Sequence, residues 1–219
     1  MSPKRFFNHV AVLVSGSSWF VPFAELLVQT LIKKGYKAKL CSSSEAVPKQ
    51  TEVVFVLSYF EILSENFLAR FPHTYVVHES ALPKGRGWAP LFWQILEGKN
   101  QIPIVLFKVE KDVDRGDIFI KDKIVLKGTE IHEEIRFLQG YKTIEMCQNF
   151  LDNYQALKPR PQRGESTKFR RRTPEDSCLD INRSLKEQIH LLRIVNNEEF
   201  PAFFKYRNRK YIIKIYPHD

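Results

Sequence analysis

Short runs of apolar residues recur along the first part of the chain, and polar turns separate them. Continuous apolar runs of this length are typical of strands that are buried on both faces of a parallel sheet. The pattern predicts strands over residues 9–14, 37–41, 52–57, 74–77, 102–109 and 118–126.

Between these runs, apolar residues return at helical spacing. In residues 21–34 the stripe is followed by Gly35, a residue that commonly ends a helix. Similar segments predict helices over residues 64–71 (with Ser64 as the N-cap), 88–97 and 129–154, the last with Gly140 as a candidate interruption. Strands that alternate with helices indicate an α/β fold with a mostly parallel, helix-covered sheet.

The composition changes near residue 158. Residues 159–172 are basic and contain prolines, residues 184–195 have a helical pattern, and residues 200–216 alternate like a hairpin. We therefore expect a catalytic domain over residues 1–157 and a small C-terminal subdomain over residues 158–219.

The formal net charge of the 219-residue chain is +9, which suits an anionic partner such as a nucleotide, a polyanionic cofactor or a nucleic acid. Cys41, Cys147 and Cys178 are scattered singly, which argues against a disulfide framework and a zinc cluster. The sequence has no apolar run of about 20 residues and no secretory signal pattern. We expect a cytoplasmic protein that does not enter the membrane.

Several familiar catalytic signatures are incomplete. His78-Glu79 and His132-Glu133 each begin a zinc-protease pattern without its second histidine. Gly85 and Gly87 lack the third glycine of a dinucleotide loop, and the sequence has neither a phosphate-binding loop nor a nucleophile elbow. These absences argue against metal hydrolysis and covalent catalysis, and we expect no metal site.

One histidine and several carboxylates follow two of the predicted strands. His78 comes directly after the apolar run at 74–77, and Asp112, Asp114 and Asp117 follow the run at 102–109. In open α/β sheets, residues after strand ends face the crevice that holds the chemistry. We expect a histidine and a carboxylate to converge at neighbouring strand ends.

Four segments occur in an order that resembles the folate-dependent formyltransferases. They are residues 57–63, His78-x-Ser80-x-Leu-Pro, Lys84-Gly-Arg-Gly, and Val113-Asp-Arg-Gly-Asp. The resemblance covers about residues 9–155. The tail is most similar to that of the nucleotide-sugar N-formyltransferases, in particular those of the pseudaminic acid pathway type.

The resemblance implies a Rossmann-like domain that uses N10-formyltetrahydrofolate as its formyl donor. The implied acceptor is the amino group of a nucleotide-linked sugar, such as a UDP-4-amino-4,6-dideoxy sugar. The implied catalytic residues are His78 and Asp114. The asparagine of the family falls on Val76. Either Glu79, Ser80, a backbone amide or a side chain from elsewhere in the chain supplies its interactions, or the activity is altered.

The resemblance also implies a set of folate contacts. The residues themselves suggest a set of substrate contacts, among them cations for a diphosphate and a serine loop for an anion. Those expected to contact the folate are Leu57, Ser58, Tyr59, Phe60, Ile62, Leu63, Val109, Lys111 and Val113. Those expected to contact the substrate are Ser15, Ser17, Glu79, Ser80, Lys84, Arg86, Trp88 and Arg171.

Two alternatives remain open. The first is an enzyme similar to methionyl-tRNA formyltransferase, and the second is a catalytically inactive module that binds nucleotides or folate. The tail of about 60 residues is short for a tRNA-binding barrel, and its basic cluster at 168–172 is small, so we expect no nucleic-acid partner. Whether the protein forms a homodimer is also open.

Overall fold

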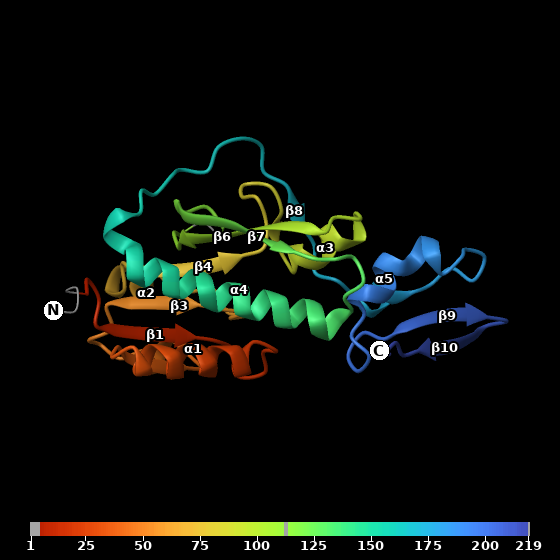
Figure 1. The fold of residues 1–219 in the computed structure, drawn as a ribbon, viewed down its shortest axis with the longest axis horizontal. Helices are drawn as coiled ribbons and strands as arrows, with labels where there is room; N and C mark the ends of the chain where they lie inside the picture. Colours follow the sequence, from red (N-terminus) through yellow and green to blue (C-terminus); the bar gives the residue numbers. More distant parts are fainter. Residues whose placement is uncertain (1–4, 112–113, 219) are drawn as a thin grey trace. The chain divides into compact units, whose positions relative to one another are not determined.

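The computed structural model describes residues 5–111 and 114–218. Within them a six-stranded sheet has the order β2-β1-β3-β4-β6-β7 (Figure 1). Its strands are β1 (His9–Leu13), β2 (Lys37–Cys41), β3 (Val53–Val56), β4 (Thr74–His78), β6 (Gln101–Lys108) and β7 (Ile118–Val125). The pairs β1–β2, β1–β3 and β3–β4 are parallel, and β4–β6 is antiparallel. The predicted α/β fold with a mostly parallel sheet is confirmed.

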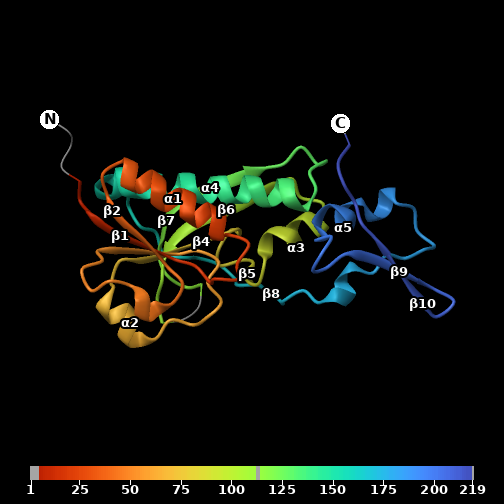
Figure 2. The ribbon, with the colours of Figure 1, turned by 90° about the horizontal axis from the view of Figure 1, so that it is seen from below.

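Helices cover both faces of the parallel strands. Helix α1 (Val21–Lys33) lies beside α4 (His132–Asn153) on one face, and α2 (Glu65–Arg70) lies on the other (Figure 2). Ser64 caps α2, because its Oγ accepts a hydrogen bond from the Phe67 amide at 3.1 Å.

Gly140 does not interrupt α4, contrary to the prediction. A Cβ atom at this position would lie 2.4 Å from the Phe23 ring of α1. The glycine therefore lets the two helices approach closely, and its role is packing.

The remaining elements are short. They are a parallel ribbon of β5 (Arg86–Gly87) and β8 (Lys168–Phe169), the helices α3 (Pro90–Leu96) and α5 (Ile189–Ile194), and a hairpin of β9 (Ala202–Tyr206) and β10 (Arg209–Ile213). The predicted hairpin is confirmed, and Arg207 and Asn208 turn it with positive φ angles of 45° and 62°. The predicted helix over 184–195 is only partly right, because α5 spans six residues after a 3-10 turn.

The chain divides into two compact units, which we describe separately. The first comprises residues 1–78, 104–122 and 140–165, and the second comprises residues 79–103, 123–139 and 166–219. A catalytic domain that ends near residue 157 remains a prediction. Within the described residues, none of the helices is both long enough and apolar enough to cross a membrane.

Candidate functional site

His78 is the last residue of β4 and is buried, with 7% of its surface exposed. Side chains alternate along a strand, so Thr74, Val76 and His78 share one face of β4. Thr74 donates from its Oγ1 to the Phe71 carbonyl at 2.7 Å, at the end of α2. This face of β4 therefore packs against α2.

Val76 lies midway along that face, where the resemblance expects an asparagine. It packs against an apolar cluster in the first unit. The buried members of the cluster are Ala11, Leu13, Cys41, Val47, Val54, Val56, Phe67 and Phe71. A carboxamide here would lose water without gaining an obvious partner, which disfavours a polar role at this position.

The predicted convergence of two strand ends is wrong, because β4 and β6 run in opposite directions. His78 pairs with Val105, whereas Lys108 at the end of β6 pairs with Tyr75. The Val109 amide then donates to the Thr74 carbonyl at 2.8 Å, at the start of β4. The end of β6 is thus about 10 Å along the strand from His78.

Asp114 lies in the loop that follows β6. It has a positive φ of 57°, and its carbonyl accepts a hydrogen bond from Gln162 Nε2 at 2.9 Å. The loop between β6 and β7 is long enough to return to His78, so the pairing of His78 with Asp114 remains a prediction. Asp112 and Val113 lie outside the described residues.

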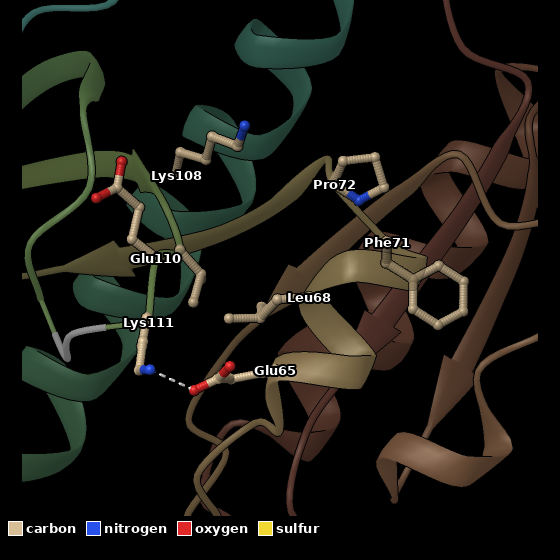
Figure 3. Close-up of a pocket in the computed structure, with 8 residues that line it drawn as sticks. Glu65, Leu68, Phe71, Pro72, Lys108, Glu110 and Lys111 are labelled. Atoms are coloured by element: carbon tan, nitrogen blue, oxygen red, sulfur yellow. Dashed lines mark ion pairs between the residues drawn. The ribbon is translucent and has the colours of Figure 1, made fainter.

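A cavity of about 340 Å³ opens beside the end of β6 (Figure 3). Its apolar wall consists of Leu68, Phe71, Pro72 and Val109, and Glu65, Lys108, Glu110 and Lys111 supply its charges. Lys111 Nζ lies 2.6 Å from Glu65 Oε1, and both side chains are more than 70% exposed. Val109 and Lys111, two of the predicted folate contacts, therefore line a real cavity; we call it the β6 pocket.

The other predicted folate contacts lie in residues 57–63, outside the lining of this pocket. Leu57 is buried, and Tyr59 and Leu63 pack against the same apolar cluster as Val76. Phe60 and Ile62 are exposed, at 51% and 85%. Within this segment, Phe60 and Ile62 therefore present the most apolar surface to solvent.

Two loops at the ends of β1 and β3 are held together by hydroxyl groups. Ser15 Oγ accepts from the Phe60 amide at 2.9 Å, and Ser18 Oγ donates to Ser58 Oγ at 2.8 Å. The first loop thus positions the second, which is a structural use of Ser15. Ser17, the other predicted anion contact of this loop, is exposed.

In the second unit, Glu79 is hydrogen-bonded through its side chain, whereas within the described residues the Ser80 hydroxyl is not. Glu79 Oε1 accepts from Gln139 Nε2 at 2.7 Å, and its carbonyl accepts from Gln94 Nε2 at 2.7 Å. Ser80 is 2% exposed, and its Oγ has no hydrogen-bond partner among the described residues. Buried hydroxyls are normally satisfied, so Ser80 is the more available of the two.

Two half-buried arginines, Arg136 and Arg172, lie near the start of α4. Arg136 lies over the Phe92 ring at 4.4 Å, and the His132 ring stacks on the same phenyl group at 5.3 Å. Burial, with the positive charges of Arg136 and Arg172, lowers the pKa of His132 to about 4. His132 is therefore neutral at pH 7. The described residues contain no group of three or more His, Cys, Asp or Glu side chains that could hold a metal ion.

The remaining predicted substrate residues follow Ser80 in a loop fastened to β8. The Arg86 amide donates to the Thr167 carbonyl at 2.9 Å, and the Trp88 amide donates to the Phe169 carbonyl at 3.2 Å. Gly87 has a φ of 96°, and a Cβ there would lie 2.4 Å from the Phe169 carbonyl oxygen. Only glycine allows this approach.

Trp88 and Arg171 are brought together, with the guanidinium 4.9 Å from the ring centre. Lys84 is exposed on the same loop. Thr167 and Phe169, which fix this loop, were not among the predicted residues, because a two-residue ribbon has no periodic sequence pattern.

The comparisons with known proteins decide the family. The model of the formyl transferase family matches residues 28–137, which is half of the chain and includes both His78 and Asp114. This chain belongs to the formyl transferase family. The predicted family and fold are thereby confirmed, and the family is one of formyl transferases.

A methionyl-tRNA formyltransferase from Francisella philomiragia is 28% identical over 137 residues. That alignment covers 62% of this chain and 44% of the relative, so the chain matches less than half of the relative's length. The structure of a methionyl-tRNA formyltransferase from Clostridium thermocellum is similar with a TM-score of 0.74 and 24% identity, over 92% of this chain and 90% of that one.

Two further structures share the fold. HypX from Aquifex aeolicus, solved in complex with tetrahydrofolic acid, has a TM-score of 0.74 and 15% identity over 92% of this chain and 36% of its own. A sugar N-formyltransferase from a Shewanella species has a TM-score of 0.68 and 13% identity, over 95% of this chain and 97% of its own. The formyl donor of the family is N10-formyltetrahydrofolate, as predicted.

Proposed function

We propose that this protein transfers the formyl group of N10-formyltetrahydrofolate to the amino group of a nucleotide-linked amino-sugar. The observation that carries the proposal is the combination of a buried histidine and a pocket on one strand pair. His78 ends β4, and the β6 pocket opens where β6 ends beside the start of β4, inside the segment that matches the family.

The reaction needs no covalent adduct with the enzyme. The neutral amine attacks the formyl carbon, a new C–N bond forms, and the bond from that carbon to N10 of the folate breaks. The amine loses a proton, and N10 gains one. We assign oxyanion stabilisation and assistance in proton transfer to His78, and orientation of His78 and acceptance of the amine proton to Asp114.

The β6 pocket is the proposed site for the pterin ring. At about 340 Å³ it is at the small end of the range for ligand pockets, which suits one bicyclic ring. Leu68, Phe71 and Val109 would contact the ring faces. We assign hydrogen bonding with the ring edge to the backbone of Glu110 and Lys111, which also line the pocket. The tetrahydrofolate held by HypX, which has the same fold, supports a folate site here.

The resemblance expects an asparagine where this chain has Val76. Another group therefore has to make the hydrogen bonds of that amide. Of the two neighbours that follow His78, Glu79 is already bound to Gln139. We assign the missing interaction to Ser80, whose buried hydroxyl has no protein partner in the described chain.

The few available charges favour a small anionic acceptor. In the basic cluster at 168–172, Arg170 is bound to Asp176, and Arg172 is half-buried. A sugar diphosphate needs two or three cations, whereas tRNA recognition uses a long basic surface. A UDP-linked 4-amino-4,6-dideoxy sugar of the pseudaminic acid pathway type is the specific acceptor that we propose.

A second candidate is formylation of an aminoacylated tRNA, which the methionyl-tRNA formyltransferase relative favours. Parallel assays with formyl-folate and either UDP- or dTDP-linked 4-amino-sugars or methionyl-tRNA separate the two. We expect a product 28 mass units heavier with an amino-sugar, formed at least about 100-fold more slowly by the His78→Asn control. Formylation of the tRNA alone would overturn the proposal.

A further inference from the structure

Two tryptophans of the second unit, Trp93 and Trp88, each have an arginine over the ring. The two pairs differ in how many of their polar groups are hydrogen-bonded. The Trp93 ring lies parallel to Phe169, with 6.0 Å between ring centres, and the Arg170 guanidinium is 4.9 Å away. Trp93 Nε1 donates to the Arg170 carbonyl at 3.0 Å, and Arg170 Nη1 donates to Asp176 Oδ2 at 2.7 Å. We call this the closed stack, because the indole N–H of Trp93 and both terminal nitrogens of Arg170 have partners.

Trp88 and Arg171 form the second stack, which is open. The Trp88 side chain is 42% exposed, and Arg171 is exposed at 4.9 Å from its ring. Over residues 5–111 and 114–218, no carboxylate pairs with Arg171, and no acceptor binds the Trp88 indole N–H. A cation held over an aromatic ring at an exposed site is only weakly bound, so a planar ligand can replace it.

The open stack stands on rigid backbone. The Trp88 amide donates a hydrogen bond to the Phe169 carbonyl, and the Phe169 ring stacks on Trp93 in the closed stack. Gly85 donates to Thr167 Oγ1 at 2.9 Å, which fastens the other end of the loop. The ring is therefore presented in a fixed position, which reduces the entropy that ligand binding would cost.

We propose that Trp88 is the stacking surface for the base of a nucleoside diphosphate, and that Arg171 binds its phosphates. The inference rests on the proposed function, because it assumes that the acceptor carries a nucleotide. On binding, the base takes the face of Trp88 that Arg171 covers, and the guanidinium turns to the diphosphate. Lys84, exposed on the same loop, supplies a second cation. Because every base has a π-face, this stacking tolerates different bases.

The test is a titration of UDP alone into the full chain, without folate or an amine. Trp19, Trp88 and Trp93 are the three tryptophans of the sequence, and we expect UDP to quench the emission of Trp88. Trp88→Ala should abolish the quench and weaken UDP binding at least 10-fold, while Trp88→Phe should retain most of the affinity. Inorganic pyrophosphate should bind equally to the protein and to Trp88→Ala.

Arg170 and Arg171 give a matched pair, since each substitution removes one cation from neighbouring positions. Arg171→Gln should weaken both UDP and pyrophosphate about 5-fold or more, and Arg170→Gln should change neither by more than about 2-fold, because Arg170 is occupied by Asp176. Unaltered UDP binding by Trp88→Ala, equal effects of the two arginine variants, or no UDP binding at millimolar concentration would each overturn the inference. The titration involves no catalysis, so failure of formyl transfer to any amino-sugar is a separate result.

Discussion

The two compact units of this protein offer ring-shaped ligands different surroundings. In the first unit, the β6 pocket has a wall of Leu68, Phe71, Pro72 and Val109, and Val76 keeps the neighbouring strand face apolar. In the second unit, arginines lie over Phe92, Trp93 and Trp88. The first unit is suited to recognise a ring by shape and burial, and the second by stacking and charge. The proposed transfer of a formyl group from a folate to a nucleotide-linked amine would use both kinds of surface.

The largest expected effect concerns the proposed chemistry in the first unit. His78→Asn and Asp114→Asn should each lower kcat by about 100-fold or more, the usual scale for lost acid–base or oxyanion assistance. Binding of tetrahydrofolate and UDP should change little, because neither residue lines the β6 pocket or the Trp88 stack. Near-normal turnover in either variant would remove that residue from the mechanism.

The charged interior of the second unit should make its stability depend on pH. The pKa of His132 is lowered from 6.5 to about 4, so between these values the unfolded chain binds a proton that the folded chain excludes. Above pH 6.5 His132 is neutral in both states and does not lower the free energy of unfolding. As the pH falls from 6.5 to about 4, the free energy of unfolding decreases by roughly 3 kcal/mol in total.

His132→Phe keeps a ring on Phe92 and removes the titration, so its denaturant-unfolding free energy should vary less over this range. The control is His218→Phe, at an exposed position. If the unfolding free energy of His132→Phe changed with pH as much as that of the wild-type protein, other groups would cause the pH dependence.

The close packing of the first unit predicts the next effect. Gly140→Ala gains up to about 1 kcal/mol of helix propensity, but its methyl group would lie 2.4 Å from the Phe23 ring. We expect the clash to prevail and the free energy of unfolding to fall by about 1–3 kcal/mol. Gly16→Ala is the matched control, because nothing lies within 4 Å of a Cβ there. A more stable Gly140→Ala protein would refute this role for the glycine.

The last effect, similar in size to that of Gly140→Ala, tests whether the apolar face of β4 is adapted to Val76. Val76→Asn should cost about 1–3 kcal/mol of stability, because the amide is buried without a partner, and should not raise turnover. Val76→Ala should remain substantially active. A gain of orders of magnitude with Asn would instead mean that the native chain has lost a catalytic group, and would favour the inactive binding module.

The sequence was most informative where burial dictates the pattern. The apolar runs predicted the sheet strands closely, and the resemblance predicted the family, because both depend on local residue order. An apolar run carries no direction, so the antiparallel placement of β6 was missed, and with it the relation of His78 to the loop of Asp114. Gly140 was misjudged because its reason lies in Phe23, more than a hundred residues away.

The candidate binding residues divide in a similar way. Val109 and Lys111 were predicted from the motif order and line a cavity, but Leu68 and Phe71 contribute to the same cavity from α2. The sequence pattern placed these two residues only in a helix over 64–71. Likewise, Trp88 and Arg171 were predicted singly, and the folded ribbon of β5 and β8 was needed to bring them together.

The most direct test of the account measures two ligands on two variants. Dissociation constants for tetrahydrofolate and for UDP would be measured by calorimetry on the wild-type protein, Leu68→Gln and Trp88→Ala. Leu68 points into the β6 pocket (Figure 3), so Leu68→Gln should weaken tetrahydrofolate about 10-fold and leave UDP unchanged. Trp88→Ala should weaken UDP binding about 10-fold and leave tetrahydrofolate binding unchanged. Equal losses of both ligands in either folded variant, or unchanged tetrahydrofolate binding in Leu68→Gln, would contradict separate recognition of the pterin and the nucleotide.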